Sequence, residues 1–125
     1  MNKKILIVDD DASILDAVSM VLEDAGYIVK INIRGEKTSE LVESFKPDLI
    51  LLDILMSGND GRKICKTLKT NEKTKNIPII LISAHPSAAG YAKTYGADDF
   101  LAKPFEIKDL LDKVKEFTSK KDNHL

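Results

Sequence analysis

Residues 5–11 have the sequence Ile-Leu-Ile-Val-Asp-Asp-Asp, in which four apolar residues are followed at once by three aspartates. An apolar run this short, without polar alternation, is typical of a strand buried on both faces of a parallel sheet. The carboxylates therefore fall where the strand ends. The same arrangement, a buried strand that ends in polar residues, recurs along the chain and predicts the fold.

Four further apolar runs follow, and a segment with helical periodicity separates each run from the next. Strands that alternate with helices, with right-handed crossovers, form a doubly wound sheet with helices on both faces. We therefore predict an α/β fold with five parallel strands. The expected strands are Ile5–Val8, Ile28–Ile31, Leu49–Leu52, Ile79–Ile82 and Phe100–Ala102.

The first helix has the clearest pattern, because apolar residues recur every three or four positions from Ile14 to Ala25. Either Asp11 or Ser13 is expected to cap its start, and Gly26 to end it in a left-handed conformation. The fourth helix has the weakest pattern, because a glycine in its middle costs about 1 kcal/mol relative to alanine. The other expected helices are Glu36–Phe45, Arg62–Thr70, a short one within Pro86–Tyr95, and Glu106–Thr118.

A chain of 125 residues with 43% hydrophobic and 31% charged residues has the composition of one globular domain. We expect residues 1–119 to form this domain and residues 120–125 to be a polar C-terminal tail. Cys65 is the only cysteine, which excludes an internal disulfide and a cysteine zinc site. We expect its side chain to pack as a small apolar group in a protein of the reducing cytoplasm.

The formal net charge of −1 hides an uneven distribution. Residues 1–60 carry six Lys and Arg against twelve Asp and Glu, whereas residues 61–125 carry thirteen against eight. The basic half has no arginine-rich run with interleaved aromatic residues, so we expect no direct nucleic-acid binding. The sequence has no apolar stretch of the length that a membrane span requires, so we expect no membrane insertion either.

Acidic side chains follow two of the expected strands. Asp9, Asp10 and Asp11 follow the first strand, and Asp53 closes the third. Functional side chains of an open α/β sheet gather at the carboxyl edge of the strands, so these carboxylates should converge. Like charges in one crevice repel each other, and hard oxygen ligands suit Mg²⁺. We therefore predict a magnesium site; the alternative is that these aspartates only cap the first helix and start a turn.

A polar residue also follows each of the last two expected strands. Ser83 and Ala84 follow the fourth strand, and Lys103 and Pro104 follow the fifth. Taken alone, a serine there is often a turn former and a Lys-Pro pair often an ordinary loop entry. Beside the carboxylates, they predict a pocket for a phosphoryl group. Lys103 and the metal would neutralise its charge, Ser83 would donate a hydrogen bond, and Asp53 would be the nucleophile that forms an acyl phosphate.

Five segments of the chain together resemble the receiver domain of two-component response regulators, and the resemblance extends from Lys4 to about Thr118. It implies a flavodoxin-like, three-layer fold with the strand order 2-1-3-4-5. The segments are residues 5–11, Pro-Asp-Leu-Ile-Leu-Leu-Asp-Ile-Leu-Met at 47–56, Asp-Gly at 60–61, Leu-Ile-Ser-Ala at 81–84 and Gly-Ala-Asp-Asp-Phe-Leu-Ala-Lys-Pro-Phe at 96–105.

The resemblance implies a role for each matching residue. Asp53 would be the phosphoacceptor, and Lys103 would pair with it or with its phosphoryl group. Asp53 and Asp10 would bind Mg²⁺ directly, and Asp9 largely through water. Leu55 would give its backbone carbonyl to the metal.

The resemblance also implies a conformational switch. A phosphoryl oxygen would draw Ser83 inwards, and Phe100 would move into the space that Ser83 leaves. The resulting change would alter binding to a downstream effector at the face formed by the fourth helix, the fifth strand and the fifth helix. The residues expected to contact partners are Ala84, Phe100, Lys103, Pro104 and Phe105.

The implied function is that of a stand-alone signalling protein, similar to single-domain chemotaxis regulators, rather than an enzyme. It would accept a phosphoryl group from a phosphohistidine of a histidine kinase or phosphotransfer protein, and would lose it slowly by autodephosphorylation. We expect a monomer or weak dimer without an output domain of its own. Alternatives are a relay shuttle that passes the phosphoryl group onward and a scaffold that binds partners independently of phosphorylation.

Two other classes fit less well. An aspartate-nucleophile phosphatase needs an acid two residues after the nucleophile, where this chain has Leu55, and a flavin-binding protein needs a Ser/Thr/Gly-rich loop after the first strand. The chain also departs from the receiver pattern at two points. Ser57 stands where the family commonly has proline, and the interval from Ser83 to Lys103 is about two residues short, which predicts a shortened fourth helix.

Overall fold

The computed structural model describes residues 2–56, 58–85 and 87–120. Among these residues, five parallel strands form the main sheet in the order β2-β1-β3-β6-β7. Two short strands, β4 and β5, pair separately, so the order of the five main strands is the predicted 2-1-3-4-5. The strands are β1 (Lys4–Val8), β2 (Ile28–Asn32), β3 (Leu49–Asp53), β4 (Leu55–Met56), β5 (Asn59–Asp60), β6 (Ile79–Ser83) and β7 (Asp99–Ala102).

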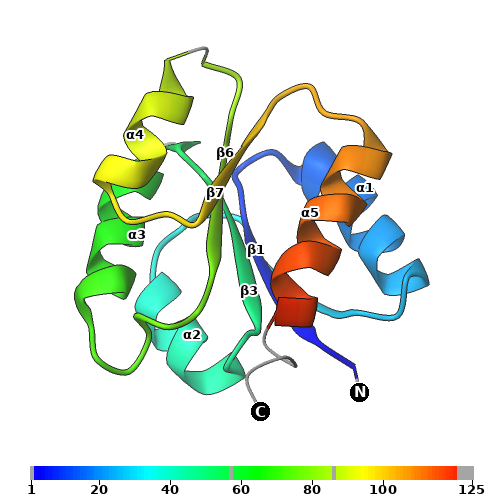
Figure 1. Cartoon of the computed structure of the whole chain (residues 1–125), viewed down its shortest axis with the longest axis horizontal. Helices are drawn as coiled ribbons and strands as arrows, with labels where there is room; N and C mark the ends of the chain where they lie inside the picture. The colour runs from blue at the N-terminus through cyan, green and yellow to red at the C-terminus, as the bar shows by residue number, and fades with distance from the viewer. Residues whose placement is uncertain (1, 57, 86, 121–125) are drawn as a thin grey trace.

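Helices cover both faces of the sheet, so the molecule has the three layers of the predicted flavodoxin-like fold (Figure 1). One face carries α1 (Ala12–Asp24) and α5 (Ile107–Lys120). The opposite face carries α2 (Thr38–Phe45), α3 (Gly61–Thr70) and α4 (Ala88–Thr94). The parallel register brings the carboxyl ends of β1, β3, β6 and β7 to one edge of the sheet.

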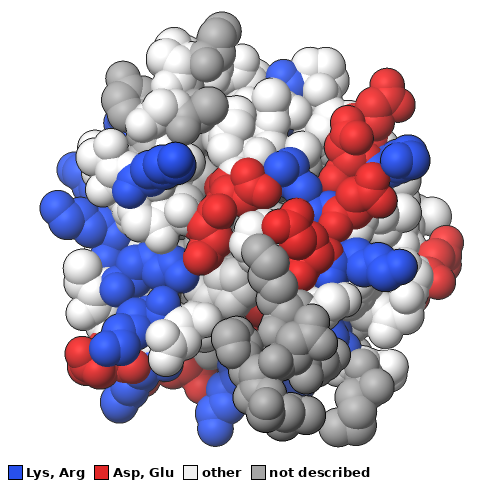
Figure 2. All heavy atoms as spheres, viewed as in Figure 1, with Lys and Arg blue, Asp and Glu red and all other residues white. Residues whose placement is uncertain are grey.

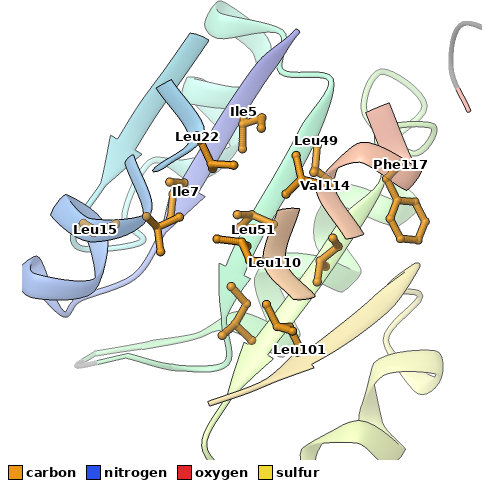
Figure 3. Close-up of a cluster of buried hydrophobic side chains, with 13 residues drawn as sticks. Ile5, Ile7, Leu15, Leu22, Leu49, Leu51, Leu101, Leu110, Val114 and Phe117 are labelled. Carbon is orange, nitrogen blue, oxygen red and sulfur yellow. The ribbon is translucent and has the colours of Figure 1, made fainter. Parts of the chain in front are cut away.

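Each face of the sheet has its own apolar core, because successive strand residues point to opposite sides. In β1, Ile5 and Ile7 belong to the cluster under α1 and α5, which Figure 3 shows, whereas Leu6 and Val8 belong to the cluster under α2 and α3. All four side chains are buried. Burial of an aliphatic side chain of this size contributes about 1.5–3 kcal/mol, so the central strands form a stable platform for the residues that follow them.

Two residues determine where α1 begins and ends. The side chain of Asp11 accepts hydrogen bonds from the backbone N–H groups of Ser13 and Ile14, at 3.0 and 3.4 Å. Of the two predicted caps, Asp11 is therefore the one that is used. Gly26, just beyond the helix, has a φ of +98°, the left-handed conformation that was predicted to end it.

The structure differs from the local predictions at four points. Strand β2 lies at an edge of the sheet, so Ile28 and Ile31 are 43% and 47% exposed instead of buried on both faces. Helix α2 begins at Thr38, because Lys37 has a left-handed backbone with φ +57°. The β4–β5 hairpin was not predicted. Helix α5 continues to Lys120, the first residue of the predicted tail, while residues 121–125 lie outside the described residues.

The fourth helix is short, as predicted. Helix α4 covers Ala88–Thr94, seven residues with Gly90 near its middle, and Pro86 lies outside the described residues. Cys65 is fully buried on α3, and burial raises the pKa of its thiol to about 11, so the side chain packs as a neutral group, as expected. Within the described residues, no helix is both long enough and apolar enough to cross a membrane.

Candidate functional site

Three of the four predicted aspartates converge at the carboxyl edge of the sheet, whereas the side chain of Asp11 caps α1 instead. Asp9 directly follows β1, and Asp53 is the last residue of the neighbouring strand β3. Carboxylate oxygens of Asp9, Asp10 and Asp53 lie within 4.8 Å of one another. Asp9 and Asp53 are buried, with exposures of 1% and 5%, whereas Asp10 is exposed. The site is therefore an acidic pocket with two carboxylates withdrawn from water and one that solvent reaches.

Lys103 brings a positive charge to this pocket from the end of β7. Its ammonium donates a hydrogen bond to Asp9 Oδ2 at 3.0 Å and lies 3.6 Å from Asp53 Oδ2. The predicted pairing with Asp53 is thus present, but the shorter contact is with Asp9. The backbone N–H of Lys103 also donates to the carbonyl of Ser83 at 2.9 Å, which holds the lysine beside the end of β6.

Burial and charge shift the protonation of this group of side chains. The pKa of Asp53 is raised to about 6, first by burial and then by the negative charge of Asp9, while Lys103 acts in the opposite direction. Burial alone lowers the pKa of Lys103, but its hydrogen bond to Asp9 and the charges of Asp53 and Asp9 raise it above the usual value. Lys103 therefore stays charged at neutral pH.

The pocket fits a hard divalent cation. One ammonium group faces three carboxylates, so a second positive charge relieves the repulsion that raises the pKa of Asp53. Carboxylate oxygens, with one exposed member at Asp10, are ligands of the kind that Mg²⁺ prefers. Leu55 begins β4 two residues after Asp53, so its backbone belongs to the same loop.

The backbone of Asp53 is held by an unusually close approach of α3. A Cβ atom placed on Gly61 would come within 2.0 Å of the carbonyl oxygen of Asp53. The N–H of Gly61 donates to the carbonyl of Ile54 at 2.8 Å, and the N–H of Ile54 donates to Ile82 at 3.0 Å. The Asp-Gly pair at 60–61 was recognised as part of the family pattern, but its physical reason, this contact, was not predicted.

The hairpin after Asp53 is attached to the loop that follows β2. The side-chain amide of Asn59 donates to the carbonyl of Arg34 at 2.7 Å, and the Met56 side chain lies against Gly35. Asp60 caps α3 by accepting the backbone N–H of Arg62 at 2.9 Å. These contacts fix the β4–β5 hairpin, which follows the candidate phosphoacceptor, against the loop after β2 and the start of α3. Ser57, where the family commonly has proline, lies outside the described residues.

Ser83 ends β6 and is 2% exposed. Its hydroxyl oxygen accepts a hydrogen bond from the backbone N–H of His85 at 3.0 Å, a partner that the sequence did not reveal. Phe100 lies on β7, directly opposite Leu81 in the register, and packs half-buried against the core under α3. The predicted switch pair therefore occupies adjacent strands of the same sheet.

The residues predicted to contact partners line two different grooves. Ala84 and Lys103 line an apolar groove of about 360 Å³ against α1, and Phe100 lines a groove of about 620 Å³ along β7 and α5. Pro104 and Phe105 line both grooves. The loop after β7 therefore forms a ridge, Pro104–Phe105, with one groove on each side.

Comparisons with known proteins agree with this fold and site. The model of the response regulator receiver domain matches residues 5–115. The chain is 37% identical over 121 residues to the DNA-binding dual master transcriptional regulator RpaA of Synechocystis, covering 95% of this chain and 50% of that protein. It is 37% identical over 112 residues to the heme response regulator HssR of Staphylococcus epidermidis, covering 88% and 49%. The chain thus spans about half the length of these relatives.

Two solved structures show the same likeness over whole chains. A CheY-like receiver domain protein from Methanospirillum hungatei has a TM-score of 0.90 and 28% identity, with 100% of both chains covered. The chemotaxis response regulator CheY4 of Vibrio cholerae has a TM-score of 0.86 and 29% identity, with 94% of this chain and 99% of that chain covered. The chain belongs to the receiver domain family of two-component response regulators.

Proposed function

We propose that this receiver accepts a phosphoryl group on Asp53 from a phosphohistidine of a histidine kinase or phosphotransfer protein. The observation that carries the proposal is the contact of Lys103 with both buried carboxylates, 3.0 Å from Asp9 and 3.6 Å from Asp53. A buried nucleophile beside a fixed cation, at the carboxyl edge of an α/β sheet, is suited to phosphoryl transfer.

The reaction requires Asp53 in its ionised form. A carboxylate oxygen of Asp53 attacks the phosphorus atom, a P–O bond forms, and the P–N bond of the donor breaks. The electron pair of that bond stays on the imidazole nitrogen of the donor histidine, which then takes a proton from solvent. Lys103 is placed beside Asp53 Oδ2, where it would stabilise the charge on the phosphoryl oxygens of the transition state.

The metal ligands would be Asp10 and Asp53 through their carboxylates, Leu55 through its backbone carbonyl, and Asp9 largely through water. The exposure of Asp10 supports direct contact, and the burial of Asp9, which accepts hydrogen bonds from Lys103 and from the N–H of Asp11, supports an indirect role. Bound Mg²⁺ would neutralise charge on the transferring phosphoryl group. The carboxylates would hold the ion at the end of β3, beside Asp53.

The phosphoryl group would act on the switch pair. Ser83 would exchange its hydrogen bond with His85 for one to a phosphoryl oxygen, and Phe100 would move into the space that the hydroxyl leaves. The two conformations would exist before phosphorylation, which shifts their populations. The output would be a change in binding to an effector protein.

The apolar groove of about 360 Å³ supports a protein as the phosphodonor. It is lined by Ile14, Ala17 and Val18 of α1 on one side and by Lys103 on the other, so it lies beside the reacting carboxylate. A helix of the donor that carries the phosphohistidine would bury apolar side chains there. Such docking would bring the phosphorus atom to Asp53 in a defined orientation.

The direct test is mass spectrometry of the chain after incubation with a small phosphodonor and Mg²⁺. We expect one added phosphoryl group on the native chain, none on Asp53→Ala, and none when a chelator removes the metal. A matched control is Asp112→Ala, which removes a carboxylate that is 64% exposed and pairs with Lys108; this variant should be labelled normally. Equal labelling of Asp53→Ala and the native chain would disprove Asp53 as the acceptor.

A further inference from the structure

The groove along β7 and α5 has an apolar floor. Its volume is about 620 Å³, and Phe100, Pro104 and Phe105 contribute ring surface to it. Phe100 and Phe105 are half-buried, so part of each ring is accessible from the groove. Accessible aromatic surface beside polar residues is typical of a site that receives an apolar side chain of a partner.

The side of this groove formed by α5 is acidic. The carboxylates of Glu106, Asp109, Asp112 and Glu116 all line it. Glu106 directly precedes α5, and the other three follow at a spacing of three or four residues along one side of the helix, which makes one acidic stripe. Figure 2 shows acidic side chains gathered over β7 and the exposed side of α5. This stripe lies in the half of the sequence that carries a net positive charge, so it is a local feature and not a consequence of composition.

Two lysines described beside the stripe, Lys108 and Lys113, offset only part of its charge. Lys113, which also lines the groove, has its ammonium 2.7 Å from Asp99 Oδ2 and is committed to that carboxylate. Lys108 lies 3.2 Å from Asp112 but is 85% exposed, so this pair is screened by water. Within the described residues, Glu106 and Asp109 form no ion pair. The groove therefore has an excess of negative charge.

We propose that this groove binds a basic segment of an effector protein, in which lysine or arginine residues flank an apolar anchor. The anchor would cover the rings of Phe100 and Phe105, and the basic side chains would pair with Glu106 and Asp109. This inference rests on the proposed function, because it names the partner class of the face that the Ser83 and Phe100 switch controls. The charge excludes an acidic partner, and it disfavours nucleic acid, whose phosphates would meet the same carboxylates.

The probes are two synthetic helical peptides of about 14 residues. One carries leucine and phenylalanine on one face and lysine on the other, and the second has glutamate in place of each lysine. The full ¹⁵N-labelled chain is titrated with each peptide, with and without Mg²⁺ and beryllium fluoride. We expect the lysine peptide to shift the amide signals of β7 and α5 and to bind more weakly as the salt concentration rises. The glutamate peptide should not bind.

Matched variants distinguish the effect of the acidic stripe from the effect of the protein's overall negative charge. Glu106→Gln with Asp109→Asn and Glu116→Gln should weaken the lysine peptide about tenfold, which corresponds to about 1.4 kcal/mol. Asp16→Asn with Glu23→Gln and Asp24→Asn removes as many exposed carboxylates from α1 and should leave the affinity unchanged. Circular dichroism of each variant checks that α5 still forms.

Three results would overturn the proposal: equal binding of the two peptides, signal shifts confined to α1 or α3, and equal loss of affinity in the two triple variants. Sedimentation that shows a dimer formed through this face would also overturn it, because a second copy would then be the occupant. Failure of the proposed function has a different signature. The lysine peptide would still bind at the groove, but beryllium fluoride would leave its affinity unchanged.

Discussion

Gly61 leaves no room for a side chain beside the backbone of Asp53, since a Cβ atom on it would lie 2.0 Å from the Asp53 carbonyl oxygen. The N-terminus of α3 and the last residue of β3 are therefore packed backbone against backbone. The backbone of Asp53, the candidate phosphoacceptor, is thus held from two directions, by its own strand and by the helix that begins eight residues later.

Gly61→Ala is expected to destabilise the fold, because the new methyl group must displace either α3 or the end of β3. Overpacking of this kind costs about 1–3 kcal/mol. The displacement should also reduce the rate of Asp53 phosphorylation at temperatures where the variant is still folded. Urea denaturation and mass spectrometry measure the two effects, and a variant with native stability and native rate would contradict the contact.

At Gly90, substitution by alanine should instead increase the stability of the fold. A Cβ atom on Gly90 meets nothing within 4 Å among the described residues outside its own stretch of α4, and the residue lies inside this helix. Replacing a helical glycine by alanine contributes up to about 1 kcal/mol of stability. Gly90→Ala is therefore expected to increase the urea midpoint, and a decrease would show that the backbone of α4 needs glycine at this point.

Asp53→Asn is expected to stabilise the metal-free chain above pH 6. The pKa of Asp53 is about 6 in the folded chain, whereas an aspartate in the unfolded chain has a pKa of about 3.8, so the folded state favours the neutral acid. The native chain loses stability as pH rises through this window, by up to about 3 kcal/mol, and the asparagine variant does not. Denaturation in a chelator from pH 4 to 8 should show a difference in stability that is small near pH 4, grows up to about pH 6 and is nearly constant above it.

Lys103→Met should slow phosphorylation by about a hundredfold, the usual effect of removing a charge-stabilising group from an active site. Because Lys103 lowers the pKa of Asp53, the substitution should also raise that pKa further, and the pH at which labelling begins should increase. Lys108→Met, at a side chain that is 85% exposed, is the matched control and should leave both quantities unchanged. An identical pH profile in Lys103→Met and the native chain would contradict this role.

Ser83→Ala is expected to separate phosphorylation from its conformational consequence. Asp53 would still be labelled, since the carboxylates and Lys103 remain, but the hydroxyl that links the phosphoryl group to Phe100 would be absent. In the native chain, beryllium fluoride should shift the NMR signals of the Phe100 ring, and in Ser83→Ala this shift should be largely lost. A full shift in the variant would mean that the ring responds by another route.

The sequence predicted the sheet and the site for the same reason. Apolar runs without polar interruption indicate buried parallel strands, and the polar residue after each run must then lie at the carboxyl edge. Asp9, Asp53, Ser83 and Lys103 all lie there in the structure. This prediction needed only the fact that parallel strands end at the same edge of the sheet.

What could not be predicted depends on tertiary contacts that leave no periodic pattern. Strands β4 and β5 have two residues each, too few for alternation to show. The closer approach of Lys103 to Asp9 than to Asp53 depends on side-chain distances of a few tenths of an ångström. The exposure of Ile31 follows from the edge position of β2, which the local composition of that strand does not reveal.

The Pro104–Phe105 ridge has a consequence for the order of events. Its two side chains are a wall of the apolar groove beside α1 and equally a wall of the acidic groove beside α5. A donor helix and an effector segment would have to share these side chains, so we expect the two partners to compete rather than to form a ternary complex. Signalling through this domain would then be sequential, with the upstream protein leaving before the downstream one arrives.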